Sequence, residues 1–116
     1  MVDGLRMLLA RLDAATGSDR ALDAEIGRLL GPRAPEAVLD YTASVDRTID
    51  LVHALLPDWG WHLGWNATGV LPYAVLHAGV RRVEAAAPTV PLALLKAMVR
   101  ALAANATGNG LAASGG

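Results

Sequence analysis

Residues 59–65, Trp59-Gly60-Trp61-His62-Leu63-Gly64-Trp65, contain every tryptophan of the chain. Large apolar residues alternate there with small or polar ones, and this period of two is typical of a β-strand. The pattern puts the three tryptophans and Leu63 on one face of a sheet, and the two glycines and His62 on the other. We therefore expect the helices before and after this strand to form its cover.

Two more strands are predicted after it. Turn residues at 66–69 precede an apolar segment at 70–77, which favours a hairpin. Pro72 cannot donate to a strand ladder, so it should lie near a strand start or on a free edge. Gly79 marks another turn, and residues 80–85 form a weaker strand, expected at the sheet edge.

The sequence leaves the register of the hairpin open. A four-residue loop would set Trp65 opposite Val70 and Trp61 opposite Ala74. Another register would set Trp65 beside Tyr73 and Trp61 beside His77.

Four helices are predicted from apolar stripes at helical spacing, at residues 2–15, 20–30, 44–56 and 90–104. Ser44 is a good N-cap for the third. The fourth is apolar around most of its circumference, so it should be the most deeply buried, with Lys96 and Arg100 on its narrow exposed side. Residues 105–116 are rich in Gly, Ala and Ser, which is typical of a flexible tail.

These elements predict an α+β fold in the order α-α-α-β-β-β-α. Apolar residues occur on both faces of the hairpin, so we expect a three-layer α/β/α sandwich around a three-stranded antiparallel meander. Helices three and four would cover one face, and helices one and two, or another subunit, the other. The organisation is then an N-terminal amphipathic helix (1–16), one domain (19–104) and a Gly-rich C-terminal tail (105–116).

Composition limits the classes of function. The chain has 116 residues, no cysteine and a net charge of -1, which gives no electrostatic reason to bind nucleic acid or an anionic membrane. It is 53% hydrophobic and 18% charged, against roughly 25% charged in an average domain, so some apolar surface should meet a partner. Residues 59–80 lack charge, but their glycines, Pro72 and period of two argue against a membrane span.

Five residues are candidates for an interaction site: Trp59, Trp61, Trp65, Arg81 and Arg82. Aromatic residues beside arginine can stack bases or sugars. A tryptophan stripe at strand spacing is more often part of a core, and Arg81 with Arg82 is the one adjacent basic pair in the sequence.

His62 and His77 could approach each other across the hairpin, with Asp58 near the same end, which would suit a metal ion. Packed or rim histidines explain the pair more simply. The glycines match no phosphate-binding loop and the serines lack a nucleophile motif. We assign no catalytic, metal or cofactor-binding residue.

Several segments resemble the phage ABA sandwich domain proteins, small proteins of phages and prophages. These segments are Leu22-Asp23-Ala24-Glu25-Ile26 to Leu30-Gly31, Tyr41-Thr42-Ala43-Ser44-Val45-Asp46 with Leu51-Val52, Pro57-Asp58-Trp59-Gly60-Trp61, and Ala85-Ala86-Ala87-Pro88-Thr89 into Leu92-Ala93-Leu94-Leu95. The resemblance covers residues 19–104. It implies a sheet with helices on both faces and a phage or prophage origin, and it implies no activity.

We therefore expect a non-enzymatic, phage-encoded structural or interaction protein, either a virion component or an accessory protein, in the host cytoplasm or the virion. Its expected partners are itself or other phage proteins, with no membrane, nucleic acid, cofactor or small-molecule substrate. The alternative is a small phage regulator or inhibitor that binds a host protein or nucleic acid. An enzyme built around His62 and His77 is a third reading.

Overall fold

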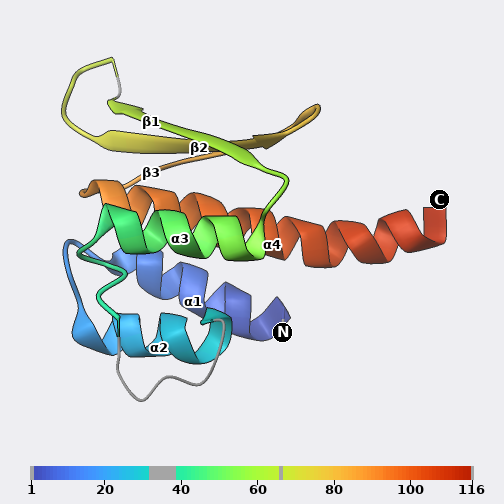
Figure 1. Ribbon diagram of the computed structural model, residues 1–116, viewed down its shortest axis with the longest axis horizontal. Helices are drawn as coiled ribbons and strands as arrows, with labels where there is room; N and C mark the ends of the chain where they lie inside the picture. The colour runs from blue at the N-terminus through green and yellow to red at the C-terminus, as the bar shows by residue number, and fades with distance from the viewer. Residues whose placement is uncertain (1, 32–38, 66, 116) are drawn as a thin grey trace.

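The computed structural model describes residues 2–31, 39–65 and 67–115 (Figure 1). Its elements are α1 (Val2–Ala14), α2 (Arg20–Leu30), α3 (Val45–Leu55), β1 (Gly60–Trp65), β2 (Pro72–Ala78), β3 (Arg81–Ala86) and α4 (Val90–Gly115). The strands form one antiparallel sheet in the order β1-β2-β3. The predicted α+β class, the element order and the edge position of the third strand are confirmed.

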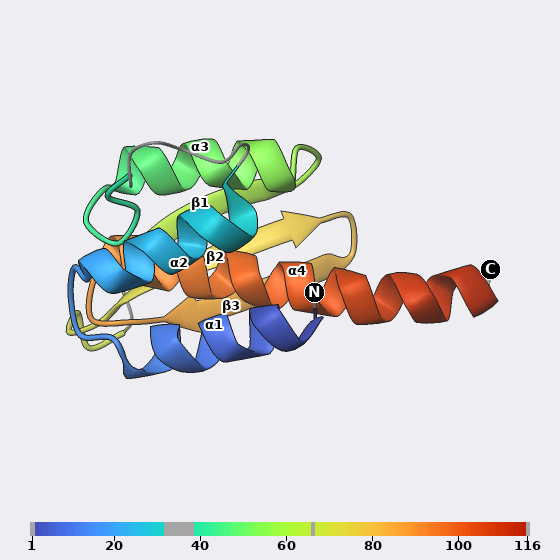
Figure 2. The same ribbon diagram turned by 90° about the horizontal axis from the view of Figure 1, so that it is seen from below.

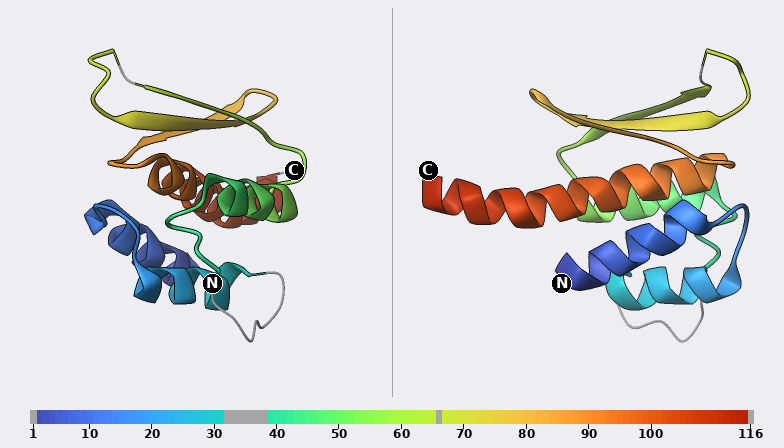
Figure 3. Two further views of the ribbon diagram at one scale, coloured as in Figure 1. Left: turned by 60° about the vertical axis from the view of Figure 1, so that its left-hand side comes forward. Right: turned by 180° about the vertical axis from the view of Figure 1, so that it is seen from behind.

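The three layers are stacked differently from the prediction. The sheet is one outer layer, α3 and α4 form the middle layer, and α1 and α2 form the other outer layer (Figures 1 and 3). α4 contacts β2 and β3 on one side and α1 on the other. The prediction that helices cover both faces of the sheet is therefore wrong. All four helices lie on one side of the sheet.

The composition of α4 explains why it lies in the middle. Its residues 91–95 and 97–99 are all buried, so the helix is apolar on the side of the sheet and on the side of α1. A helix that is apolar around its circumference needs cover on both sides. α1 supplies the second cover with a stripe of buried leucines, Leu5, Leu8 and Leu12.

The outer face of the sheet covers its own apolar residues. Val75 lies there between His62 on β1 and Glu84 on β3, and only 1% of it is exposed. The ring of Tyr73 lies over Gly64, where a Cβ atom would come within 2.8 Å of it. Likewise, the ring of His77 lies over Gly60. Side chains that span neighbouring glycines leave this face little need of a helix layer.

The observed register differs from both alternatives. Trp65 pairs with Pro72, and Trp61 pairs with Leu76. Compared with the register predicted for a four-residue loop, β2 has shifted by two residues relative to β1. A shift by an even number keeps every side chain on the predicted face of the sheet. Pro72 begins β2, so the turn is longer than predicted.

The helix ends follow local chemistry. Asp19 caps α2 by accepting from the Leu22 N–H at 3.0 Å, and Ser44 caps α3 by accepting from the Arg47 N–H at 3.2 Å. The last helix continues to Gly115, where a flexible tail was predicted from residue 105. Each residue added to an existing helix gains a hydrogen bond without a new nucleation cost, which opposes the low helix propensity of the glycines and asparagines in this segment.

The turn before α3 is fixed to α2 by a buried carboxylate. Asp23 accepts hydrogen bonds from the backbone N–H and the hydroxyl of Thr42, both at 2.7 Å, and pairs with Arg20 at 3.0 Å. Thr48 on α3 donates to the carbonyl of Tyr41 at 2.9 Å. These contacts join α2, the turn and α3 into one unit. In the described part of the chain, no helix combines the length and apolar character needed to cross a membrane.

Candidate interaction surface

Trp59 and Arg81 are brought together at one end of the sheet. The Arg81 guanidinium lies over the Trp59 ring, 5.3 Å from its centroid, and Nη2 also donates to Oδ1 of Asn105 on α4. Trp59 is half-buried against the core. The pair therefore joins the β2–β3 hairpin to α4, and its aromatic face is already occupied by a cation.

Trp61 is packed between the sheet and α3. It is half-buried, and its Nε1–H donates to Nε2 of His53 on α3 at 3.2 Å. The indole thus connects β1 to the helix beneath it.

Trp65 lies apart from the other two tryptophans, at the far end of β1. Its side chain is 61% exposed, and Val70 and Leu71 in the following turn are exposed as well. We call these three residues the apolar hairpin end. One residue of the predicted tryptophan stripe is therefore outside the core.

Arg82 points to the outer face, opposite to Arg81, because neighbouring side chains of a strand alternate between its faces. It lies 3.5 Å from Glu84, an exposed ion pair within β3. The five candidate residues therefore form no single site. Trp59 and Arg81 lie together, whereas Trp61, Trp65 and Arg82 each lie in a separate place.

The two histidines do come together across the hairpin. The ring centroids of His62 and His77 are 5.8 Å apart and both side chains are exposed. Among the residues that the structure describes, no three His, Cys, Asp or Glu side chains are arranged to hold a metal ion.

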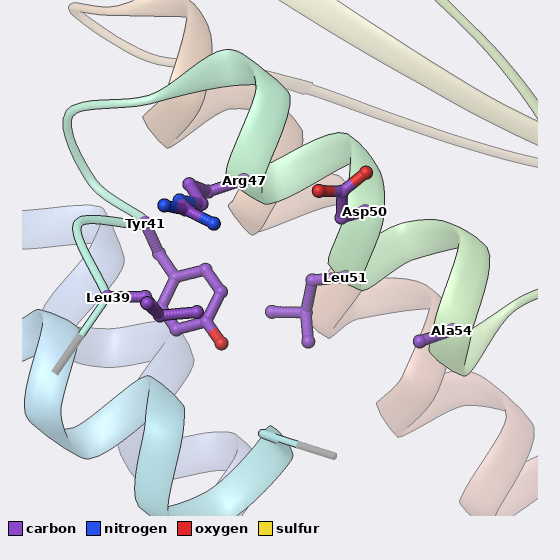
Figure 4. A pocket seen from close by; sticks show the side chains of 6 residues that line it. All are labelled: Leu39, Tyr41, Arg47, Asp50, Leu51 and Ala54. Atoms are coloured by element: carbon purple, nitrogen blue, oxygen red, sulfur yellow. The ribbon is translucent and has the colours of Figure 1, made fainter. Parts of the chain in front are cut away.

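A small cavity of about 100 Å³ lies between α3 and the preceding turn (Figure 4). The side chains of Tyr41 and Leu51 face each other across it, and Leu39, Arg47, Asp50 and Ala54 complete its lining. Pockets for small organic ligands usually measure roughly 300 Å³ or more. This volume suits a few water molecules better than a substrate.

The two edges of the sheet are finished in different ways. On β3, the carbonyl of Glu84 accepts from Nη1 of Arg100 at 2.9 Å, and the carbonyl of Ala86 accepts from Nζ of Lys96 at 2.8 Å. Both cations come from α4, so its narrow polar side closes this edge. Unpaired carbonyls on an edge strand are templates for another strand, and here they are occupied.

Among the described residues, no side chain closes the β1 edge in this way. The carbonyls of Glu84 and Ala86 point away from β2, so these residues are not hydrogen-bonded to their partners on β2, which are Val75 and Tyr73. In an antiparallel sheet, the backbone groups of Val75 and Tyr73 must then point toward β1. His62 and Gly64, opposite these two, then use their backbone groups within the sheet. It follows that the N–H and C=O groups of Trp61, Leu63 and Trp65 point outward, on a strand without Lys, Arg, Asp, Glu or Pro.

The β1 edge was not among the candidate sites predicted from the sequence. The available signal was the contrast in charge between residues 60–65, which have none, and residues 81–86, which include Arg81, Arg82 and Glu84. The role of Lys96 and Arg100 could not be found, because it depends on how α4 lies along β3.

No family model, curated protein or solved structure matches the chain.

Proposed function

We propose that this chain is a non-enzymatic structural or interaction protein that associates with itself and with other proteins of the same phage or prophage. Its phage origin, whether as virion component or accessory protein, rests on the resemblance of residues 19–104. The interaction role has separate support from the surface of the sheet.

The observation that carries the proposal is the apolar hairpin end formed by Trp65, Val70 and Leu71. The chain has only 18% charged residues with which to cover its surface, and at this end of the hairpin a tryptophan and two aliphatic side chains are exposed. Large apolar side chains left exposed near one another in the chain favour an interaction surface. Tryptophan is also among the residues that contribute most to such surfaces.

The alternative is a small phage regulator or inhibitor that binds a host protein or nucleic acid, and its binding to nucleic acid has weaker support. Arg81 already lies over Trp59, and Arg82 is paired with Glu84. Binding to phosphates would compete with both contacts. Salt-dependent retention on single-stranded DNA that is lost when both arginines are replaced would favour this alternative.

Light scattering after size exclusion tests self-association. The wild-type chain should form a dimer or larger species whose proportion rises with concentration, and the triple variant W65S/V70S/L71S should be monomeric. Val80 in the other hairpin is an aliphatic residue that is even more exposed, so V80S is the control and should behave as wild type. A wild-type chain that stays monomeric at high concentration contradicts self-association.

A further inference from the structure

We propose that the open edge of β1 binds an extended, cationic segment of a partner protein, which adds a fourth strand to the sheet beside β1. This proposal rests on the role as an interaction protein, but not on self-association. Its first support is the contrast between the edges. β3 is closed by Lys96 and Arg100, whereas the outward backbone groups of Trp61, Leu63 and Trp65 have no such partner side chain among the described residues.

α3 provides a floor for the added strand. It runs beneath the free edge of β1 (Figures 1 and 2), and Trp61 contacts it through His53. Residues three, four and seven positions before His53 lie on the same stripe of the helix. These are Asp50, Ile49 and Asp46.

The stripe determines the charge of the partner. Asp46 and Asp50 are both exposed, and neither forms an ion pair with another described residue. Their repulsion, four positions apart on one helix, would be relieved by a cation above them. Ile49, between them, is half-buried. The floor therefore suits a segment with an apolar side chain at its centre and Arg or Lys beside it.

The position of α3 also distinguishes between possible occupants. In an antiparallel pairing of two copies through β1, both helix layers would lie on the same side of the joined sheet, and each α3, which runs beneath the edge of its own β1, would run close to the α3 of the other copy. Helix axes need 8–10 Å between them. An extended segment without a covering helix meets no such obstacle, and strand addition of this kind is an established mode of peptide recognition.

The test uses the full chain and a synthetic blocked peptide of alternating valine and threonine with an arginine at each end. We expect binding, seen as a change in the fluorescence of exposed Trp65. We also expect slower hydrogen exchange at the N–H groups of Trp61, Leu63 and Trp65, which should exchange quickly in the free protein. The same peptide with glutamate at both ends should bind at least about threefold more weakly. The two aspartates attract the arginines of the first peptide and repel the glutamates of the second.

Two variants identify the contacts. W65P removes one outward N–H from an exposed position, where proline is tolerated, and should bind about fivefold to tenfold more weakly than W65S, as expected for one lost hydrogen bond. Both variants lack the Trp65 reporter, so their binding is measured by calorimetry. D46N/D50N should remove the preference for arginine over glutamate. D3N, which changes an exposed aspartate on α1, is the matched control and should leave that preference unchanged.

Each outcome has a distinct meaning. No binding near millimolar peptide, or binding without protection of the three amides, overturns the proposal. Equal binding of the arginine and glutamate peptides contradicts the proposal that the partner segment is cationic. Peptide binding by a chain that light scattering shows to be monomeric supports the strand addition and contradicts self-association, so the two proposals fail separately.

Discussion

The guanidinium of Arg100 on α4 donates to the backbone carbonyl of Glu84 on β3 at 2.9 Å. This contact joins the most deeply buried helix to the β3 edge of the sheet. It explains why a helix that is mostly apolar keeps a charge in this position. The contact stabilises the fold and also occupies a group that could pair with a foreign strand.

Replacing Arg100 with Met should therefore have two effects. The stem of the side chain is kept, while the loss of the hydrogen bond should lower the free energy of unfolding by about 1 kcal/mol, measured in urea. The opened edge should also increase aggregation, measured by light scattering at a concentration where wild type is stable. R82M changes an exposed arginine on β3 itself and should do neither; equal aggregation of both variants would contradict the role of Arg100 in closing the β3 edge.

The buried Asp23 provides a second prediction. D23A leaves the backbone N–H of Thr42 without its acceptor inside the protein, and a buried unsatisfied donor next to a lost ion pair should cost about 3 kcal/mol or more of unfolding free energy. T42V keeps the shape and removes only the hydroxyl, so it should cost about 1–3 kcal/mol.

Glu25, on the exposed side of the same helix, provides the control for Asp23. Its ion pair with Arg28 is open to solvent, so E25Q should unfold at nearly the wild-type urea concentration. If D23A unfolded like E25Q, the carboxylate would not hold the turn before α3.

Local patterns were enough to predict the helices and the faces of the strands. Capping by Ser44 and the apolar stripe after it determine α3, because both act within a few residues. In the same way, the alternation in residues 59–65 placed Trp61 and Leu63 on the helix side of the sheet.

Features that depend on distant contacts were not predictable. The layer order follows from packing α1 against α4, and the cover of the outer face follows from rings of Tyr73 and His77 lying over glycines of the neighbouring strand. The separation of Trp65 from Trp59 also escaped the pattern. The alternation of residues along a strand determines which face of the sheet a side chain occupies. It does not determine whether the helix layer extends far enough to cover that side chain.

Tyr41 predicts a dependence of stability on high pH. Burial raises the pKa of its phenol above the usual value, Asp23 raises it further, and nearby Arg47 opposes this in part. Between the ordinary pKa of about 10 and the raised one, the folded state keeps a proton that the unfolded state has lost, so stability should fall as pH rises through this window.

The measurement is absorbance of tyrosinate during a pH titration, made in the Y73F background so that Tyr41 is the one tyrosine left. Its midpoint should lie above that of a free tyrosine. In urea unfolding, Y41F should lose much of the decline above pH 10. A midpoint at or below the free value would contradict burial of this ring.

The contact between Arg81 and Trp59 gives the last prediction, with Arg82 as its natural control. R81A removes both the cation above the indole and the hydrogen bond to Asn105, so the free energy of unfolding should fall by about 1–2 kcal/mol. R82A removes only an exposed ion pair with Glu84 and should cost less than about 0.5 kcal/mol. Because Trp59 is half-buried and its ring lies against this cation, R81A should also alter the fluorescence of the folded protein more than R82A does. Equal effects on stability would mean that Arg81, like its neighbour, is an ordinary surface charge, and would make it available for binding phosphates.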